Sequence, residues 1–172
     1  MNKIFVEVYK EFKPDIDIIK VKECIKASLD LGSDFSCNDS VSISVVDRQK
    51  IKNLNEEFLN DNHLTDVLSF PYSSNWNLGI NKKVDLQVKD QESYLGDIFI
   101  CFEKIKTQAD DYNIDLNLEL NIIIAHGVLH LLGFDHFDKL EEEKMIKKTI
   151  KIIKHLKLDH IKAKLSLETR NE

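Results

Sequence analysis

The chain has 172 residues, the size of one compact domain, and its 42% hydrophobic content suffices for a sizeable core. These values exclude disorder and fibrous repeats, and no repeat, low-complexity tract or linker divides the chain, so we predict a single domain over residues 1–172. The 30 Asp and Glu residues outnumber the 24 Lys and Arg residues, giving a formal charge of −6. This balance disfavours a protein that binds nucleic acid by bulk electrostatics.

Neither a membrane helix nor a disulfide framework is expected. Histidines interrupt the longest apolar runs well short of the roughly eighteen residues that a membrane helix needs, and the N-terminus alternates like a strand rather than a signal peptide. We therefore expect a cytoplasmic protein. Cys24, Cys37 and Cys101 form no C-x-x-C pair and are odd in number, so we expect reduced, buried thiols.

Alternating apolar residues rich in β-branched side chains predict four strands. The polar segment from Tyr72 to Tyr94 has no clear period and predicts a long surface loop with room for a short hairpin. The expected strands are Ile4–Tyr9, Val41–Asp47, Thr65–Pro71 and Leu95–Cys101.

Apolar residues at helical spacing predict about five helices. Gly32 is expected to cap the first of them, and Asp138 with Glu141 forms a capping-box-like start for the last. In the fourth, apolar residues cover nearly every direction, which is typical of a helix buried on all sides. The pattern favours an α/β (α+β) fold, with helices covering a small mixed four-stranded sheet. The expected helices are 18–32, 48–58, 102–112, 115–132 and 138–156.

Three of the six histidines lie within eleven residues, HGVLHLLGFDH. His126 and His130 lie one turn apart on the same face of the fourth helix, so both imidazoles can reach one ion. A continuing helix would point His136 away from them, so the helix must stop, and Gly133 can take the left-handed conformation that ends it.

A lone H-x-x-x-H pair more often marks core histidines bonded to neighbours, but three imidazoles and the glycine together favour a metal site. We predict one Zn²⁺ per chain at the end of this buried central helix, held by His126, His130 and His136 with a fourth position open for water. Three neutral ligands would lower the pKa of a zinc-bound water toward about 7, which implies hydrolysis.

The spacing H-x-x-x-H-x-x-G-x-x-H is also that of a long zinc-protease signature. Those enzymes carry a glutamate general base after the first histidine, where this chain has Gly127. A metal-dependent peptidase or other hydrolase is therefore an alternative that lacks its usual base.

The segment HGVLHLLGFDH, with TDVLSFP at Thr65–Pro71 and LGDI at Leu95–Ile98, resembles the YbeY family of bacterial endoribonucleases. The resemblance implies a zinc site at the three histidines and a single-strand-specific endoribonuclease. It also implies roles in 16S rRNA 3′-end maturation and 30S ribosome quality control, with 16S precursor RNA, the 30S subunit and its basic proteins as partners. A second alternative is a ribosome-assembly binding factor whose zinc is mainly structural.

One position departs from the family pattern. Family members usually carry an arginine where this chain has Leu59, and leucine cannot hold a phosphate by a bidentate fork, so this clamp is not carried over. His63, the nearest basic residue, is expected to be a solvated loop residue.

No general base is assigned. Thr65 and Ser69 are weak catalytic candidates that can line a groove beside the metal or make local backbone hydrogen bonds. Asp97 can orient a ligand histidine or serve as a satisfied turn carboxylate.

The charge is unevenly distributed. From Lys144 to Glu172 there are nine Lys and Arg and three Asp and Glu residues, a net of +6, whereas the first 143 residues hold fifteen against twenty-seven, a net of −12. The basic C-terminal helix and tail, about 138–172, presents lysines that can follow an RNA backbone or form the solvated face opposite an isoleucine stripe. These lysines are Lys144, Lys147, Lys148, Lys151 and Lys154.

Overall fold

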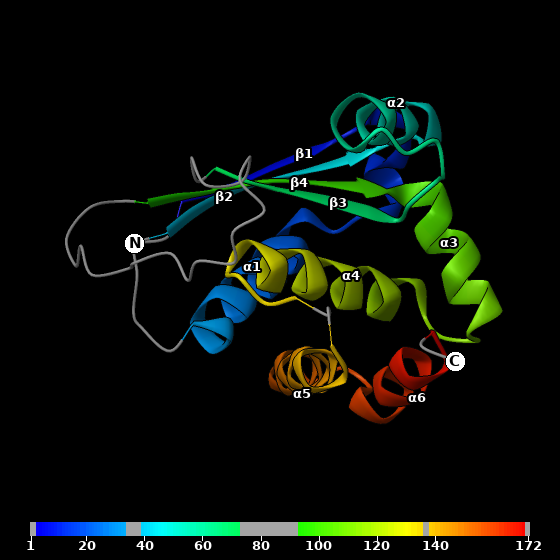
Figure 1. Cartoon of the computed structure of the whole chain (residues 1–172). Coiled ribbons are helices and arrows are strands. Elements are labelled where there is room, and N and C mark those ends of the chain that lie inside the picture. The colour runs from blue at the N-terminus through cyan, green and yellow to red at the C-terminus, as the bar shows by residue number, and fades with distance from the viewer. Residues whose placement is uncertain (1–2, 34–38, 73–92, 136–137, 171–172) are drawn as a thin grey trace.

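The computed structural model describes residues 3–33, 39–72, 93–135 and 138–170. The predicted α/β class is confirmed, because a four-stranded mixed sheet carries helices on its faces (Figure 1). The strands are β1 Lys3–Val8, β2 Asp39–Val46, β3 Val67–Pro71 and β4 Ser93–Cys101. The helices are α1 Ile18–Gly32, α2 Arg48–Leu59, α3 Phe102–Asp111, α4 Leu116–Leu131, α5 Lys139–His155 and α6 His160–Arg170, and a 3₁₀ helix, η1, spans Lys10–Asp15.

The strand order is β1-β2-β4-β3. The pairs β1–β2 and β2–β4 are parallel, and β3 pairs antiparallel with β4 at the edge of the sheet. Parallel strands need crossover connections, and α1 provides the one between β1 and β2. Most of the predicted loop from Tyr72 to Tyr94 lies in residues 73–92, outside the described residues, and its last two residues, Ser93 and Tyr94, belong to β4 instead.

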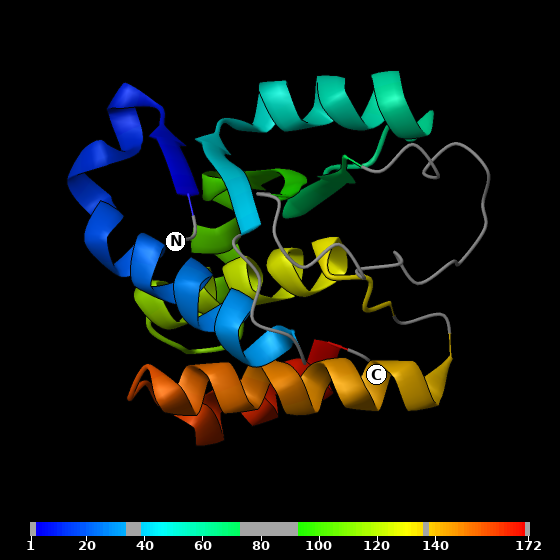
Figure 2. The same cartoon turned by 90° about the vertical axis from the view of Figure 1, so that its left-hand side faces the viewer.

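The sheet has two faces with different coverings. Helices α1 and α4 lie against one face and α2 lies over part of the other, while α5 and α6 lie beneath α1 and α4 (Figures 1 and 2). Side chains alternate along each strand, so Ile98 and Ile100 of β4 belong to the main core with residues of α1 and α4. The alternate residue Phe99 and its neighbour Phe70 pack on the side of α2.

Helix α4 is buried between the sheet and α5, as its apolar composition predicts. Twelve of its sixteen residues are buried, including Ile122, Ile124 and Val128. It starts at Asp115, whose carboxylate accepts hydrogen bonds from the backbone N–H groups of Asn117 and Leu118 at 2.9 and 3.3 Å. Packing on all sides gives the second half of α4 a fixed position against the edge strand β3.

Two local expectations change. Gly32 ends α1 but does not adopt the left-handed conformation. A Cβ at this position would lie 2.6 Å from Leu132 Cδ1, so the glycine lets the end of α1 lie close to the side chains at the end of α4. The C-terminal segment holds a second helix, α6, because Lys157 takes a left-handed φ of 57° that ends α5 and Asp159 caps the next helix through the N–H of Lys162.

Among the described residues, no single helix is long and apolar enough to cross a membrane. The bent pair α3 and α4 passes the same test of length and composition together, with an angle of 118° between its members.

The thiols of Cys24 and Cys101 are free and buried, as predicted, whereas Cys37 lies outside the described residues. Burial raises the pKa of the Cys24 thiol to about 12, so at pH 8 it is protonated and unreactive. Because the folded state keeps this thiol protonated, the free energy of unfolding is unaffected below the unfolded pKa of about 9 and falls as the pH rises from there through about 12.

We expect Cys24 and Cys101 of the native protein to react slowly with Ellman's reagent at pH 8. All three thiols should react promptly in guanidinium chloride. Rapid native labelling of Cys24, located by mass spectrometry, would contradict the burial argument.

Candidate metal centre

His126 and His130 are the two polar side chains in the otherwise apolar second half of α4. Both are half-buried, while Ala125, Gly127 and Leu129 beside them are fully buried. The two Nε2 atoms lie 3.0 Å apart, and the ring centroids lie 4.5 Å apart. The predicted one-turn spacing therefore directs both imidazoles to the same point beside the helix.

The donor set fits a zinc ion. Two nitrogen ligands of a tetrahedral zinc, each about 2.0–2.1 Å from the ion, lie about 3.3 Å apart. The observed Nε2–Nε2 separation of 3.0 Å differs from this by a few tenths of an ångström. His136 lies outside the described residues, and the described part of the chain has no group of three metal-ligating side chains. The complete ligand set stays a prediction.

Helix α4 ends as Gly133 predicts. Gly133 has a left-handed φ of 88°, its N–H donates to the His130 carbonyl at 2.9 Å, and the N–H of Phe134 donates to the Leu129 carbonyl at 3.0 Å. This pair of bonds is the Schellman motif, which satisfies the last carbonyls of a helix and reverses the chain. The turn starts directly after the two histidines and leads through Asp135 toward His136.

We expect Gly133→Ala to lower the free energy of unfolding by about 1 kcal/mol, because an L-residue is strained in the left-handed region. Among the described residues, no atom lies within 4 Å of the point that a Cβ on Gly133 would occupy, so strain and not a clash is the cause. Gly133→Asn should cost less, since asparagine tolerates this conformation. Urea unfolding of the two variants measures the difference, and equal losses would contradict the backbone explanation.

Gly127 lies where α4 crosses the edge of the sheet. A Cβ on it would lie 3.0 Å from Ile98 Cγ2 and 3.3 Å from Ser69 Oγ. The Ser69 hydroxyl also donates to the Gly127 carbonyl at 3.3 Å. The position after the first histidine is therefore a helix-to-sheet contact without room for a glutamate side chain.

The weak catalytic candidates separate in space. Ser69 contacts α4 next to His126, because its hydroxyl donates to the backbone carbonyl of Gly127. Thr65 precedes β3, and its hydroxyl donates to the Val67 carbonyl at 3.2 Å, which is the local role considered from sequence. Of these two, Ser69 bonds to α4, whereas the Thr65 hydroxyl bonds within its own segment.

Asp97 lies on the other face of the sheet. It pairs with Phe70, whose ring packs on the side of α2, and it accepts a hydrogen bond from the Tyr94 hydroxyl at 2.7 Å. Partial burial and the Asp97 carboxylate raise the pKa of Tyr94 to about 12. Asp97 therefore has Tyr94 as a side-chain partner, and it lies on the sheet face opposite to α4.

The residues around the position of the family's arginine are exposed. Leu59 is the last residue of α2 and is 46% exposed. The His63 side chain is 93% exposed and pairs with Asp61 at 2.6 Å, which agrees with a solvated loop residue. Hydrogen bonds from His63 lower the pKa of Asp61.

The lysine face of α5 is not uniform. Lys144 and Lys147 are exposed and pair with Glu141 and Glu143 of the same helix. Lys148 instead turns inward and donates to carbonyls at the end of α1. Sequence periodicity grouped it with the solvated lysines, because no local pattern shows that the end of α1 lies beside it.

Comparisons with known proteins decide the family. The family model described as Endoribonuclease YbeY matches residues 8–157, which is most of the chain. This chain belongs to the YbeY family.

Relatives and a solved structure agree with the family. The chain is 36% identical over 134 residues to Endoribonuclease YbeY of Phytoplasma australiense, covering 78% of this chain and 86% of that protein. It is 35% identical over 161 residues to the Acetivibrio thermocellus protein of the same name, covering 91% and 98%. The solution structure of TM1509 from Thermotoga maritima has a TM-score of 0.57 and 25% identity, covering 91% of this chain and 89% of that one.

Membership in the YbeY family has direct consequences. The family consists of endoribonucleases, so the chain is a hydrolase that acts on RNA, and it is a metalloenzyme family in general. The imidazole pair of α4 is the described feature of this chain that suits a metal ion.

Proposed function

We propose that this YbeY protein is a zinc-dependent, single-strand-specific endoribonuclease with one Zn²⁺ per chain, held by His126, His130 and His136. The observation that carries the proposal is the convergence of His126 and His130, with Nε2 atoms 3.0 Å apart, on a buried helix that ends directly after them. Three imidazoles without a thiolate are typical of catalytic rather than structural zinc.

The chain's own residues would bind the metal ion and hold its ligands in position. The imidazoles hold the ion, Gly133 reverses the chain after them, and the Ser69 bond to Gly127 fixes α4 against β3. The ion, when bound, would polarise a phosphoryl oxygen and acidify a water. Ser69, whose hydroxyl donates to the Gly127 carbonyl, is our candidate for a contact to a substrate phosphate.

We further propose that the substrate is 16S rRNA precursor, cleaved during 3′-end maturation and 30S quality control. Charge supports a ribosomal setting, because the net −12 of residues 1–143 suits docking on basic ribosomal proteins better than binding of naked RNA. We expect weak, strongly salt-dependent binding of free RNA. Nanomolar affinity that salt does not change would contradict this proposal.

The direct test is cleavage of labelled single-stranded RNA, with a duplex of the same sequence as the comparison. Activity should be lost with a chelator, return with Zn²⁺, and be weak on the duplex. A 2′,3′-cyclic phosphate on the product would show attack by the ribose hydroxyl, and a 5′ phosphate would show attack by water. Full activity after exhaustive metal removal would refute the metal mechanism.

A ribosome-assembly factor with a mainly structural zinc is the second candidate, favoured by Leu59 at the place of the usual arginine. Its test is genetic. If a variant with all three histidines replaced still binds the 30S subunit and restores rRNA processing in cells, binding and not cleavage is the function.

A further inference from the structure

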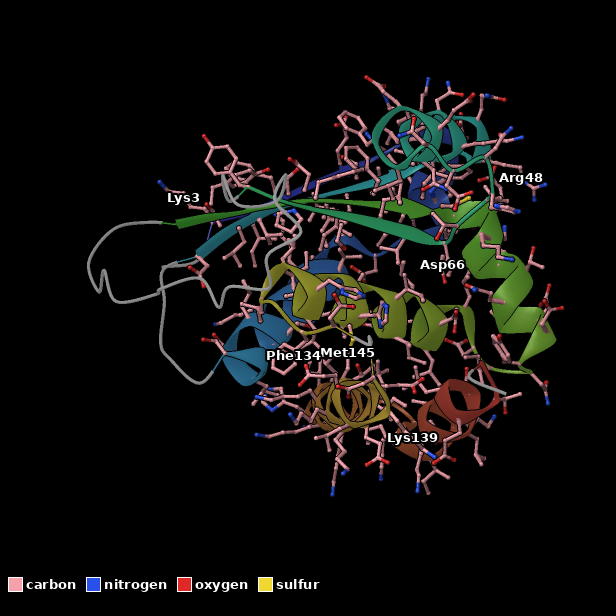
Figure 3. All side chains as sticks on the ribbon, viewed as in Figure 1. Lys3, Arg48, Asp66, Phe134, Lys139 and Met145 are labelled. Atoms are coloured by element: carbon pink, nitrogen blue, oxygen red, sulfur yellow. The ribbon has the colours of Figure 1, made fainter. Side chains whose placement is uncertain are left out.

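Aromatic side chains gather at the edge strand β3, on the face of the sheet that carries α2. Helix α2 covers this face at the carboxyl ends of β2 and β4, where Leu54 packs with Val46 and Cys101. Farther along the strands, side chains stand on this face with no helix of the described residues above them (Figures 1 and 3). Two exposed rings lie here, Tyr72 directly after β3 and Phe58 in the last turn of α2. Their exposed fractions are 73% and 56%.

Each exposed ring rests against a more buried ring. The ring centroids of Tyr72 and Tyr94 lie 5.4 Å apart with planes at 69°, and those of Phe58 and Phe70 lie 5.1 Å apart with planes at 58°. Such tilted contacts between aromatic rings are favourable. The Tyr94 hydroxyl is itself fixed, because it donates to Asp97 at 2.7 Å. A ring that is already oriented loses little rotamer freedom when a flat ligand stacks on it.

Strand β3 connects these rings to the metal centre. Ser69 bonds to the Gly127 carbonyl of α4, whereas the next residue, Phe70, packs on the side of α2. The N–H of Tyr72 donates to the Leu95 carbonyl at 2.9 Å, so the pairing with β4 continues to Tyr72. At about 3.4 Å per residue, Tyr72 lies about 10 Å along the strand from Ser69. Because β3 is an edge strand, one flexible chain can pass over this edge and contact both faces of the sheet.

The charge of this part of the chain favours stacking over phosphate contacts as a source of RNA affinity. Residues 1–143 carry the net charge of −12 given above, which opposes binding through phosphate groups. Every base has a flat π-face that can stack on an aromatic ring, whatever the charge of the surroundings. Bases in a duplex already stack on their neighbours, so exposed rings favour unpaired bases. The occupant that suits the two rings is therefore a single strand of RNA.

We propose that Tyr72 and Phe58 form a base-stacking surface for single-stranded RNA, which continues from the metal centre over the β3 edge. This inference rests on the single-strand specificity proposed above, and it concerns residues that hold the strand, not residues that cleave it. Each base stacked on a ring typically raises affinity about five- to a hundredfold. Tyr72 should contribute more than Phe58, because its ring is the more exposed of the two.

The test is binding of a short fluorescein-labelled oligoadenylate to the full chain, measured by fluorescence anisotropy with a chelator present so that no metal-dependent cleavage occurs. Tyr72→Ala should raise the dissociation constant about tenfold, and Phe58→Ala should raise it less. Tyr72→Trp keeps a ring face and should bind at least as tightly as the wild type, whereas Tyr72→Leu should resemble Tyr72→Ala. Phe5→Ala is the matched control and should have no effect, since Phe5 is also 56% exposed but lies on the opposite edge strand, β1.

Salt dependence separates stacking from a loss of phosphate contacts. Wild type and Tyr72→Ala should show the same slope of log affinity against log salt concentration, because stacking neutralises no phosphate. Wild-type affinity in Tyr72→Ala, a Tyr72→Trp protein that binds no better than Tyr72→Ala, or an equal loss in Phe5→Ala would each overturn the inference. Cleavage that resists metal removal would refute the proposed metal mechanism without changing these binding results, so the two failures are distinguishable.

Discussion

Replacing His130 with alanine should reduce RNA cleavage by about a thousandfold or more and weaken zinc binding in parallel. The two Nε2 atoms of His126 and His130 lie 3.0 Å apart. Replacing either histidine with alanine would leave a single imidazole on α4 to hold the ion. Metal stabilisation of developing charge is worth several kcal/mol, and about 4 kcal/mol corresponds to a thousandfold in rate. Single-turnover cleavage of a labelled single-stranded RNA measures the loss.

The control is His155→Ala, since His155 lies exposed in the last turn of α5. It should retain wild-type cleavage and zinc content. Circular dichroism and urea unfolding establish that the His130 variant is folded. If a folded His130→Ala protein cleaves RNA at the wild-type rate, the imidazole pair has no part in catalysis.

Gly127→Glu should lower the free energy of unfolding by about 3–5 kcal/mol and create no peptidase. The substitution places a side chain in a contact where even a Cβ would lie 3.0 Å from Ile98 Cγ2, and it brings a carboxylate between α4 and the sheet. Overpacking typically costs about 1–3 kcal/mol, and burial of an unpaired charge adds to it. Urea unfolding gives the stability, and a casein substrate tests for peptidase activity.

Gly127→Ala is the matched comparison, because it adds only the Cβ. The strain from the added Cβ is opposed by a gain of about 1 kcal/mol in helix propensity. The free energy of unfolding of Gly127→Ala should therefore fall much less than that of Gly127→Glu. A stable Gly127→Glu protein that hydrolyses casein and loses this activity on His126→Ala would instead revive the peptidase alternative.

The periodicity of apolar residues was sufficient to predict most of the helices and strands. All four strands and five of the helices follow from alternating or helical apolar patterns, within a few residues of the bounds in the structure. The break between α5 and α6 has no such signal. Glycine or proline usually marks a helix end, but here Lys157 takes the left-handed conformation, and the basic composition continues across the break.

Residue spacing along α4 was also sufficient to predict the imidazole pair and the turn at Gly133, since both depend on local geometry. The surroundings of the pair were not predictable in this way. Helix α4 covers one face of the sheet. Ser69 lies on that face and bonds to α4, whereas Asp97 lies on the opposite face and bonds to Tyr94. The approach of Lys148 to the end of α1 joins residues 116 positions apart, which no local pattern contains.

If His126 and His130 bind the proposed zinc ion, their placement one turn apart on α4 would link metal loading to the folding of the chain. An ion held by the two imidazoles would tie successive turns of the helix together, so its binding free energy would add to the free energy of unfolding. At a free zinc concentration a thousandfold above the dissociation constant, this addition is about 4 kcal/mol. The thermal midpoint should then rise with the logarithm of free zinc. Amide hydrogen exchange should slow most in the final turns of α4, where a bound ion would oppose local opening of the backbone.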